Sequence, residues 1–200
     1  MARYTGPSNK LFRNYGVKDL SNRKLTTSMR QHASGQHGAT RKKSSDYALQ
    51  LKAKQTIRMT YLVNEKQFAK YYEIASRKTG VTGTIMLQML ESRLDNVLYR
   101  AGFAITRRQA RQIVNHAHVL VNGKKVDIPS YLLKAGDVVT VRENSKAFVK
   151  NVIESIDLAL NYAWLTVDRD ELKVTFDRIP QREELDPEFK EQLVIEYYSK

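Results

Sequence analysis

Cysteine is absent from the 200 residues, which excludes disulfides, a thiolate zinc site and a cysteine nucleophile. Long apolar runs are absent too: none approaches the roughly 18 residues of a membrane helix, and the first residues lack the apolar core of a secretory signal. Acidic residues are scarce, because 21 Asp and Glu face 34 Lys and Arg. We therefore expect a cytoplasmic protein with no membrane partner, whose net charge of +13 favours a polyanionic partner.

The positive charge is concentrated at the amino-terminal end. Residues 1–45 carry a net charge of +9, with Asp19 as their single acidic residue, and they hold few aliphatic side chains. Such a segment cannot bury enough apolar surface to fold alone. We interpret it as a basic arm that becomes ordered on its partner, with a short helix from about Lys10 to Tyr15. Its candidate phosphate ligands are Arg3, Lys10, Arg13, Arg41, Lys42 and Lys43.

Helical periodicity begins at Asp46. Apolar residues there recur at three-to-four spacing, and Asn64 is placed to cap a second helix. An apolar stripe predicts a third helix from about Thr84 to Ala101, which Gly102 ends. Further candidate phosphate ligands in the first of these helices are Lys52, Lys54 and Arg58.

A short amphipathic helix is predicted from Thr106, which forms a Thr-x-x-Gln capping box with Gln109. Arg107, Arg108 and Arg111 are predicted to share its outward face. Three guanidiniums near a helix amino terminus favour phosphate, because unpaired N–H groups and the helix dipole act in the same direction.

A basic hairpin is predicted next. Asn122-Gly123 is typical of a type I′ turn and joins expected strands at 119–121 and 126–128, with a third strand from about 138 to 142. Lys124 and Lys125 follow the turn directly. We therefore add Asn122, Lys124 and Lys125 to the candidate ligands.

These runs resemble the S-four RNA-binding module, an α-L motif. The residues that carry the resemblance are Ser92 through Arg100, Thr106 through Gln112, Val119 through Val126, and Gly136-Asp137. Segments that flank this module resemble one family in particular, the S-four family of bacterial small-subunit ribosomal proteins. These segments are residues 1–7, Gly35 through Gly38, Ser45 through Tyr47 and Glu196 through Lys200. The resemblance extends over the whole chain.

The resemblance implies an α+β fold, in which a basic extended arm precedes a mainly helical domain and an α-L RNA-binding motif with a small antiparallel sheet. We expect the arm at 1–45, the helical domain at 46–91 with 178–200 packing on it, and the α-L domain and sheet at 92–177.

The implied function is that of a structural constituent of the small ribosomal subunit. Family members bind the five-prime domain of 16S-type ribosomal RNA early, nucleate assembly of the 30S body and, with neighbouring proteins S five and S twelve, affect translational accuracy. Contact with messenger RNA at its entry channel and repression of the protein's own messenger are implied as hypotheses.

The carboxyl-terminal segment is acidic, with a net charge of −2 over residues 178–200. It suits a protein neighbour better than phosphate, and the resemblance points to S five. Its candidate protein contacts are Glu183, Glu184, Phe189 and Glu196. A solvated acidic surface is the alternative for any single glutamate.

Some relatives hold zinc with four cysteines in the arm, but Asn9 and Phe12 stand at two of the matching positions here. We therefore expect no metal and no cofactor. His32 and His37 are interpreted as RNA-contacting or solvated.

An enzyme is the rival class, because the same module occurs in enzymes that modify or charge RNA. The chain has no Gly-rich phosphate loop, no His-Glu-x-x-His and no Gly-x-Ser-x-Gly. Asp168, Asp170 and Glu171 are adjacent carboxylates that fit a β-turn. We expect neither catalysis nor a small-molecule substrate. A free RNA-binding regulator stays open as a second alternative, and a DNA-binding protein is disfavoured because no dimeric recognition helices are predicted.

Overall fold

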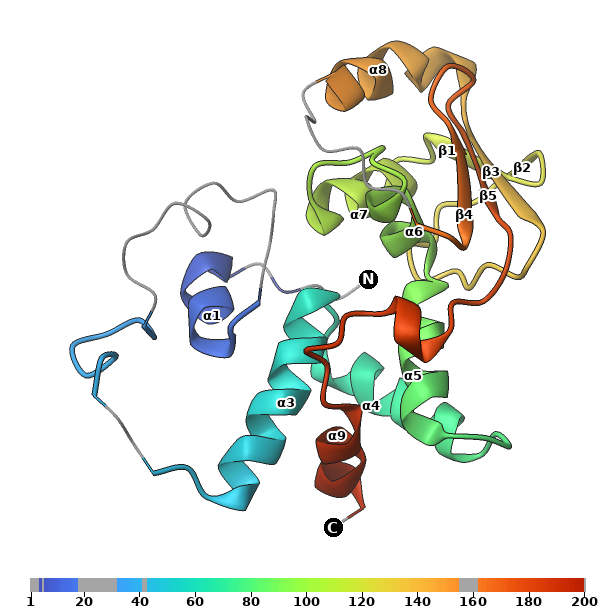
Figure 1. Cartoon of the computed structure of the whole chain (residues 1–200). Helices are drawn as coiled ribbons and strands as arrows, with labels where there is room; N and C mark the ends of the chain where they lie inside the picture. Colours follow the sequence, from blue (N-terminus) through green and yellow to red (C-terminus); the bar gives the residue numbers. More distant parts are fainter. Residues whose placement is uncertain (1–3, 5, 18–31, 41–42, 155–161, 200) are drawn as a thin grey trace. The chain divides into compact units, whose positions relative to one another are not determined.

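The computed structural model describes residues 4, 6–17, 32–40, 43–154 and 162–199 (Figure 1). The chain forms two compact units. The first contains residues 1–86 and 186–200, and the second contains residues 87–185. The described part of the first is helical, whereas the second combines helices with a sheet, which confirms the predicted α+β class.

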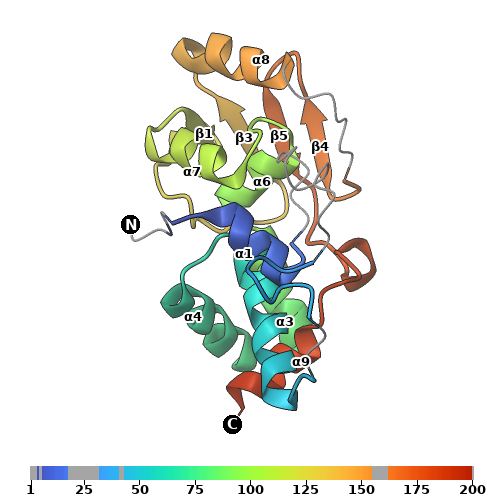
Figure 2. The ribbon, with the colours of Figure 1, turned by 90° about the vertical axis from the view of Figure 1, so that its left-hand side faces the viewer.

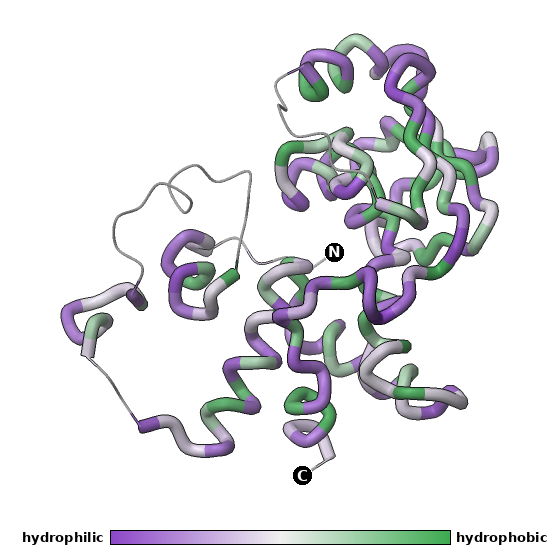
Figure 3. Tube along the Cα trace, viewed as in Figure 1, coloured by the Kyte–Doolittle hydropathy of each residue, from purple (hydrophilic) through white to green (hydrophobic). Residues whose placement is uncertain are grey.

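The first unit is built around α3 (Asp46–Thr60), with α1 (Ser8–Tyr15), α4 (Glu65–Ser76) and α9 (Glu191–Tyr198). Helices α1 and α9 both pack against α3 (Figures 1 and 2). Figure 3 shows polar and apolar residues alternating along α3, as expected for a helix that buries one side. The helices predicted near Lys10 and from Asp46 are thus confirmed.

Helix α1 lies inside the segment interpreted as an arm, yet it packs on the helical unit. Phe12 and Val17 form a buried apolar cluster with Met59 and Leu62. The Thr56 hydroxyl also donates a hydrogen bond to the carbonyl of Tyr15. The arm therefore has its own anchoring point on α3, which its low aliphatic content did not indicate.

The long helix predicted from Thr84 to Ala101 is wrong in one respect, because the chain breaks it in two. Helix α5 spans Thr82–Glu91 and α6 spans Leu94–Arg100. Between them Arg93 is extended and forms an isolated antiparallel bridge with Leu132. The Ser92 carbonyl accepts a hydrogen bond from the Leu133 N–H. Pairing with a later segment thus replaces the helical bonds, with neither Gly nor Pro at the break.

The second unit contains a five-stranded antiparallel sheet in the order β2-β1-β3-β5-β4. Its strands are β1 (Val119–Val121), β2 (Lys124–Lys125), β3 (Asp137–Val141), β4 (Leu165–Asp168) and β5 (Lys173–Phe176). Helices α6 and α7 (Arg107–Asn115) lie on one face of it (Figures 1 and 2). Val121, Val139 and Val174 are buried and neighbours in register, so the sheet has one core-facing side.

The predicted turns are confirmed. Asn122 and Gly123 both have positive φ, at 49° and 76°, as a type I′ turn requires. Strand β2 ends at Lys125, however, so the strand predicted at 126–128 is wrong and that segment runs outside the sheet. Between β4 and β5 the Asp168 carboxylate accepts hydrogen bonds from the N–H groups of Asp170 and Glu171. These carboxylates close a turn, as predicted.

Within the described ranges, no helix has both the length and the apolar character needed to span a bilayer. Nor do three or more His, Asp or Glu side chains gather there in a way that could hold a metal ion.

Candidate nucleic-acid interface

Helix α7 begins with the cap that the sequence predicts. The Thr106 hydroxyl accepts a hydrogen bond from the Gln109 N–H at 3.1 Å. The reciprocal bond differs by one residue from a standard capping box, since the Gln109 side chain accepts from the N–H of Ile105 at 2.8 Å. Both bonds fix the helix start, and with it the positions of Arg107 and Arg108.

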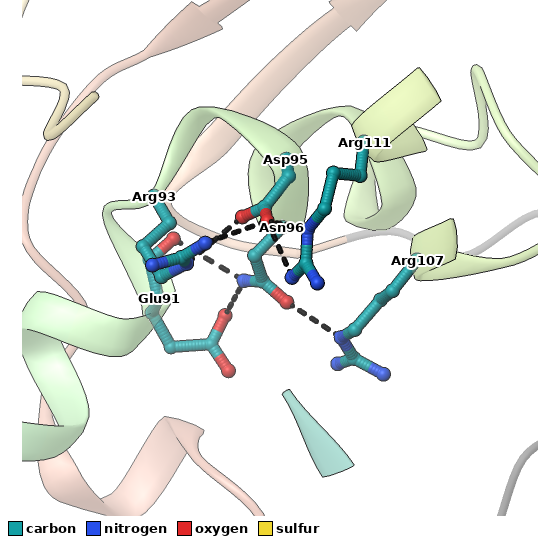
Figure 4. A network of polar contacts seen from close by, with 6 residues as sticks. All are labelled: Glu91, Arg93, Asp95, Asn96, Arg107 and Arg111. Carbon is teal, nitrogen blue, oxygen red and sulfur yellow. Dashed lines mark hydrogen bonds and ion pairs between the residues drawn. The ribbon is translucent and has the colours of Figure 1, made fainter. Parts of the chain in front are cut away.

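A buried carboxylate, Asp95 on α6, organises the surroundings of α7 (Figure 4). The Arg93 guanidinium donates to both of its oxygens, through Nε at 2.9 Å and Nη2 at 2.7 Å. Arg111 donates through Nε at 2.9 Å and Nη2 at 2.7 Å to Oδ2. Asp95 is 2% exposed and Arg111 8%, so these charge-assisted bonds are shielded from water.

A second carboxylate, Glu91, extends the network toward Arg107. It accepts from the amide nitrogen of Asn96 at 2.6 Å and from Arg100 at 2.7 Å. The Asn96 carbonyl oxygen then accepts from Nε of Arg107 at 2.9 Å. Asn96 is buried, so its two polar ends are committed to fixed partners and orient the Arg107 guanidinium (Figure 4).

The cluster carries an excess of positive charge. The guanidiniums of Arg93 and Arg111 pair with Asp95 and that of Arg100 pairs with Glu91, while Arg107 is held by the Asn96 amide. These four cations and two carboxylates sum to a net charge of +2. The Arg107 guanidinium also lies over the Tyr99 ring, 4.2 Å from its centroid. Arg108 is exposed beside it at the start of α7. A polyanion such as a phosphate backbone matches this pattern of charge.

The prediction that Arg111 faces outward with Arg107 and Arg108 is wrong. Arg111 is buried, as are Ala110, Ile113 and Val114, and it forms an ion pair with Asp95. Sequence reasoning also missed Glu91, Asp95 and Asn96 as residues that build the site. The one signal for Asp95 and Asn96 was their place in the run Ser92 through Arg100 that carries the family resemblance, whereas Glu91, the last residue of α5, lies just before that run.

The hairpin contributes exposed lysines. Lys124 and Lys125 are both exposed on β2. Asn122 has a structural task, since its amide nitrogen donates to Asp137 at 2.8 Å and its carbonyl oxygen accepts from the Val138 N–H at 2.9 Å. It therefore holds the hairpin turn against β3.

The basic candidates of the first unit differ in how exposed they are. Lys10, Lys43 and Lys52 are exposed, and Arg13 and Arg58 are partly buried. Lys54 is only 4% exposed; its ammonium lies 2.7 Å from a Glu65 carboxylate oxygen and 4.3 Å from the Tyr197 ring centroid. The remaining candidates lie outside the described residues and are Arg3, Arg41 and Lys42.

Glu65 joins α3, α4 and α9. Partial burial acts to raise the pKa of its carboxyl, but hydrogen bonds from Lys54 and Tyr198 outweigh that effect and leave the pKa below its ordinary value. The Tyr198 hydroxyl donates to Glu65 at 2.8 Å, and burial followed by this bond raises the pKa of Tyr198. Lys54 thus belongs to the joint that attaches the carboxyl-terminal helix.

The acidic candidates are also unequally placed. The hydrogen bond from the Arg178 guanidinium, followed by one from the Gln181 backbone, lowers the pKa of Glu184 to about 2. Glu196 accepts from Gln50 at 3.0 Å, and Phe189 is buried near the Tyr61 ring. Glu183 is exposed. Three of the four therefore have intramolecular contacts, and Glu183 is the most accessible.

Two families match consecutive parts of the chain. Residues 3–91 match the Ribosomal protein S4/S9 N-terminal domain, and residues 92–139 match the S4 domain. The chain is also 50% identical over 206 residues to the small ribosomal subunit protein uS4 of Mesomycoplasma hyopneumoniae, with all of both chains covered. The chain belongs to the uS4 family of small ribosomal subunit proteins.

Other uS4 proteins are similarly close. The protein uS4A of Symbiobacterium thermophilum is 50% identical over 208 residues, and uS4 of Exiguobacterium sibiricum is 48% identical over 201 residues, again with all of both chains covered. The predicted family is confirmed, and with it a structural, non-enzymatic ribosomal protein with an S4 RNA-binding domain. In this uS4 chain the network of Figure 4 crosses the boundary between the two matches, since Glu91 ends the first and Asp95 lies in the second.

Proposed function

We propose that this protein is a primary binder of the five-prime domain of 16S-type ribosomal RNA, and that it nucleates assembly of the 30S body in the cytoplasm. The observation that carries the proposal is the ordered cluster on α6 and α7. Its buried carboxylates and Asn96 position Arg107 at the start of a capped helix, beside exposed Arg108. A preorganised guanidinium binds phosphate without first giving up side-chain freedom.

The roles of the basic residues follow from their accessibility. We assign phosphate contact to partly buried Arg107, which is oriented at the start of α7, and to exposed side chains, which are Lys10, Lys43, Lys52, Arg108, Lys124 and Lys125. Arg111, Lys54 and Asn122 act as positioning residues, because their polar groups are engaged in bonds within the protein. A folded RNA presents backbone contours more readily than base edges, so recognition rests on shape and phosphate geometry.

We also propose contacts of this chain with a neighbouring protein and with messenger RNA. Exposed Glu183 and the acidic carboxyl-terminal segment suit contact with a protein such as S five, through which the chain would affect translational accuracy together with S twelve. The exposed lysines near the start of α3 suit contact with messenger RNA at its entry channel. Charge reversal at Lys43 and Lys52 that left unwinding of messenger structure unchanged would exclude that second contact.

The proposal is tested by binding to a transcript of the five-prime domain across a salt series, compared with an unrelated structured RNA of equal length. If six to ten phosphates are neutralised, affinity falls by roughly three to five decades between 50 and 200 mM salt. Only a preference for the five-prime-domain transcript that persists near physiological salt therefore supports the proposal. We expect the double variant Arg107→Glu, Arg108→Glu to lose selective binding.

A charge-reversal control is Arg169→Glu, which changes the net charge by two units where the double variant changes it by four. Arg169 is exposed in the same unit but stands among Asp168, Asp170 and Glu171, where the local charge disfavours phosphate. We expect it to bind like the unmodified protein. Equal binding of both RNAs by the unmodified protein would reduce the proposal to a non-specific RNA-binding module.

A further inference from the structure

A row of rings lies at the carboxyl end of α7, away from the capped end that carries Arg107 and Arg108. The rings of His116 and His118 stack with centroids 5.8 Å apart and an interplanar angle of 27°. The Phe148 ring on α8 (Lys146–Glu154) continues the row, 6.2 Å from His118. In both ribbon views α8 lies beyond α7, away from α6 (Figures 1 and 2).

The backbone fixes these rings in place. Helix α7 ends in a Schellman motif, in which the His118 N–H donates to the Ile113 carbonyl and the Ala117 N–H to that of Val114. Ala117 has φ of +57°, a left-handed conformation that turns the chain so that its two neighbours present their rings together. The imidazole Nδ1 of His118 lies 2.8 Å from the hydroxyl of buried Ser145, which orients that ring.

The row is open to solvent and lies beside positive charge. Helix α8 is packed against the rest of the unit through Val149 and Val152, which are buried. Phe148 on the same helix is nevertheless 49% exposed. Arg142 is held next to the turn, with Nη1 donating to the Ala117 carbonyl at 3.2 Å. Lys146, which follows Ser145 in the chain, forms an ion pair with Glu143.

We propose that His116, His118 and Phe148 form a stacking platform for an unpaired RNA base, with Arg142 beside the adjoining phosphate. Preset rings lose little conformational freedom on binding, and every base has a face that stacks on them. A cation next to the rings suits the backbone of the same nucleotide. The inference rests on the proposed function, since it adds a second contact site to the same RNA.

The test measures affinity for the five-prime-domain transcript near physiological salt with Phe148→Ala, Phe148→Leu and His116→Ala. If a base stacks on these rings, each of the three variants should weaken binding by roughly fivefold or more. Phe148→Leu should bind no better than Phe148→Ala, because leucine restores apolar bulk without a π-face. Ile179→Ala is the matched control, because Ile179 is 50% exposed in the same unit, and we expect its affinity to stay within about twofold. Ultraviolet-induced zero-length crosslinks of the unmodified protein should map to peptides that contain His118 or Phe148.

Affinities of all three variants within about twofold of the unmodified protein would overturn the platform. Full rescue by Phe148→Leu would also overturn it, because the surface would then be an apolar contact, as for a protein neighbour. If the unmodified protein shows no preference for the transcript, the proposed function fails separately. In that case the platform is tested with a single-stranded oligouridylate and the matching abasic strand. If Phe148→Leu weakens binding of the oligouridylate more than binding of the abasic strand, the platform is supported. If it weakens both equally, the platform is excluded.

Discussion

Asp95 is the shared ion-pair partner of two arginines in a place from which water is excluded. Replacing it with the isosteric Asn would remove this carboxylate from the buried guanidiniums of Arg93 and Arg111. We expect Asp95→Asn to lower the free energy of unfolding of the second unit by about 3–5 kcal/mol, the range for breaking a buried ion pair. Urea unfolding followed by fluorescence of Trp164 measures this, because the single tryptophan of the chain is buried in that unit.

The comparison variant in the same unit is Glu143→Gln. Glu143 forms an ion pair with Lys146 three residues away, but its side chain is 82% exposed. Loss of this pair should change the free energy of unfolding by less than about 0.5 kcal/mol. Equal effects of Asp95→Asn and Glu143→Gln would contradict the buried network. Glu73 on α4, which is exposed and pairs with exposed Arg77, is the corresponding control residue in the first unit.

Residue types and helical spacing correctly located Arg107 and Arg108, but could not locate their partners. Arg111 was expected outside because its spacing places it on the same helix face as Arg107 and Arg108, and its burial follows from Asp95 on a different helix. Lys54 is a parallel case, since its partners Glu65 and Tyr197 come from two other helices. A buried charge is explained by tertiary neighbours, which a periodic pattern along one helix does not contain.

Among the elements, α7 depends on its cap. Thr106→Ala removes the acceptor of the Gln109 N–H, and such a loss lowers stability by about 1 kcal/mol. We expect a matching decrease in the unfolding midpoint followed by Trp164, and a weaker affinity for RNA because the first turn of α7 carries Arg107 and Arg108. Thr106→Ser, which keeps the hydroxyl, should restore both, and failure to do so would show that the cap is not responsible.

The joint of α3, α4 and α9 predicts a pH dependence. The pKa of Glu65 is lowered in the folded protein relative to its ordinary value of 4.5. Its contribution to stability is therefore fully present above pH 4.5 and is lost as the pH falls below that value. Because the carboxylate is half exposed, we expect a contribution of no more than about 1 kcal/mol.

Hydrogen exchange of the amides of α9 measures this effect. In the unmodified protein their protection should fall as the pH decreases below 4.5, beyond the intrinsic change in exchange rate. In Glu65→Gln that additional decrease should disappear, whereas in Glu73→Gln it should remain. An unchanged acid profile in Glu65→Gln would assign the loss of protection to other carboxylates.

Local rules predicted most element positions. The cap at Thr106, the Asn122-Gly123 turn and the glycine that ends α6 all act through bonds within a few residues. The break between α5 and α6 was not predicted, because it depends on the bridge between Arg93 and Leu132. The second hairpin strand was predicted at 126–128, whereas β2 spans Lys124–Lys125, because alternation continues past the residues that pair.

At the scale of the whole molecule, charge is segregated along the chain. The amino-terminal 45 residues hold most of the net positive charge, while the last 23 residues are net negative. Composition alone therefore indicated a polyanionic partner at one end and a different kind of neighbour at the other. It could not indicate that the best-ordered cations lie in the middle of the chain, on α7, because that order comes from buried carboxylates.

We infer that the buried network acts on RNA through Arg107. A double-mutant cycle on affinity for the five-prime-domain transcript tests it, with Asn96→Ala, Arg107→Ala and the combined variant, each checked for folding through Trp164. We predict that Asn96→Ala weakens binding in the unmodified background and has no further effect once Arg107 is removed. Additive losses from the two substitutions, or an unchanged affinity in Asn96→Ala, would show that the network does not act on RNA through Arg107.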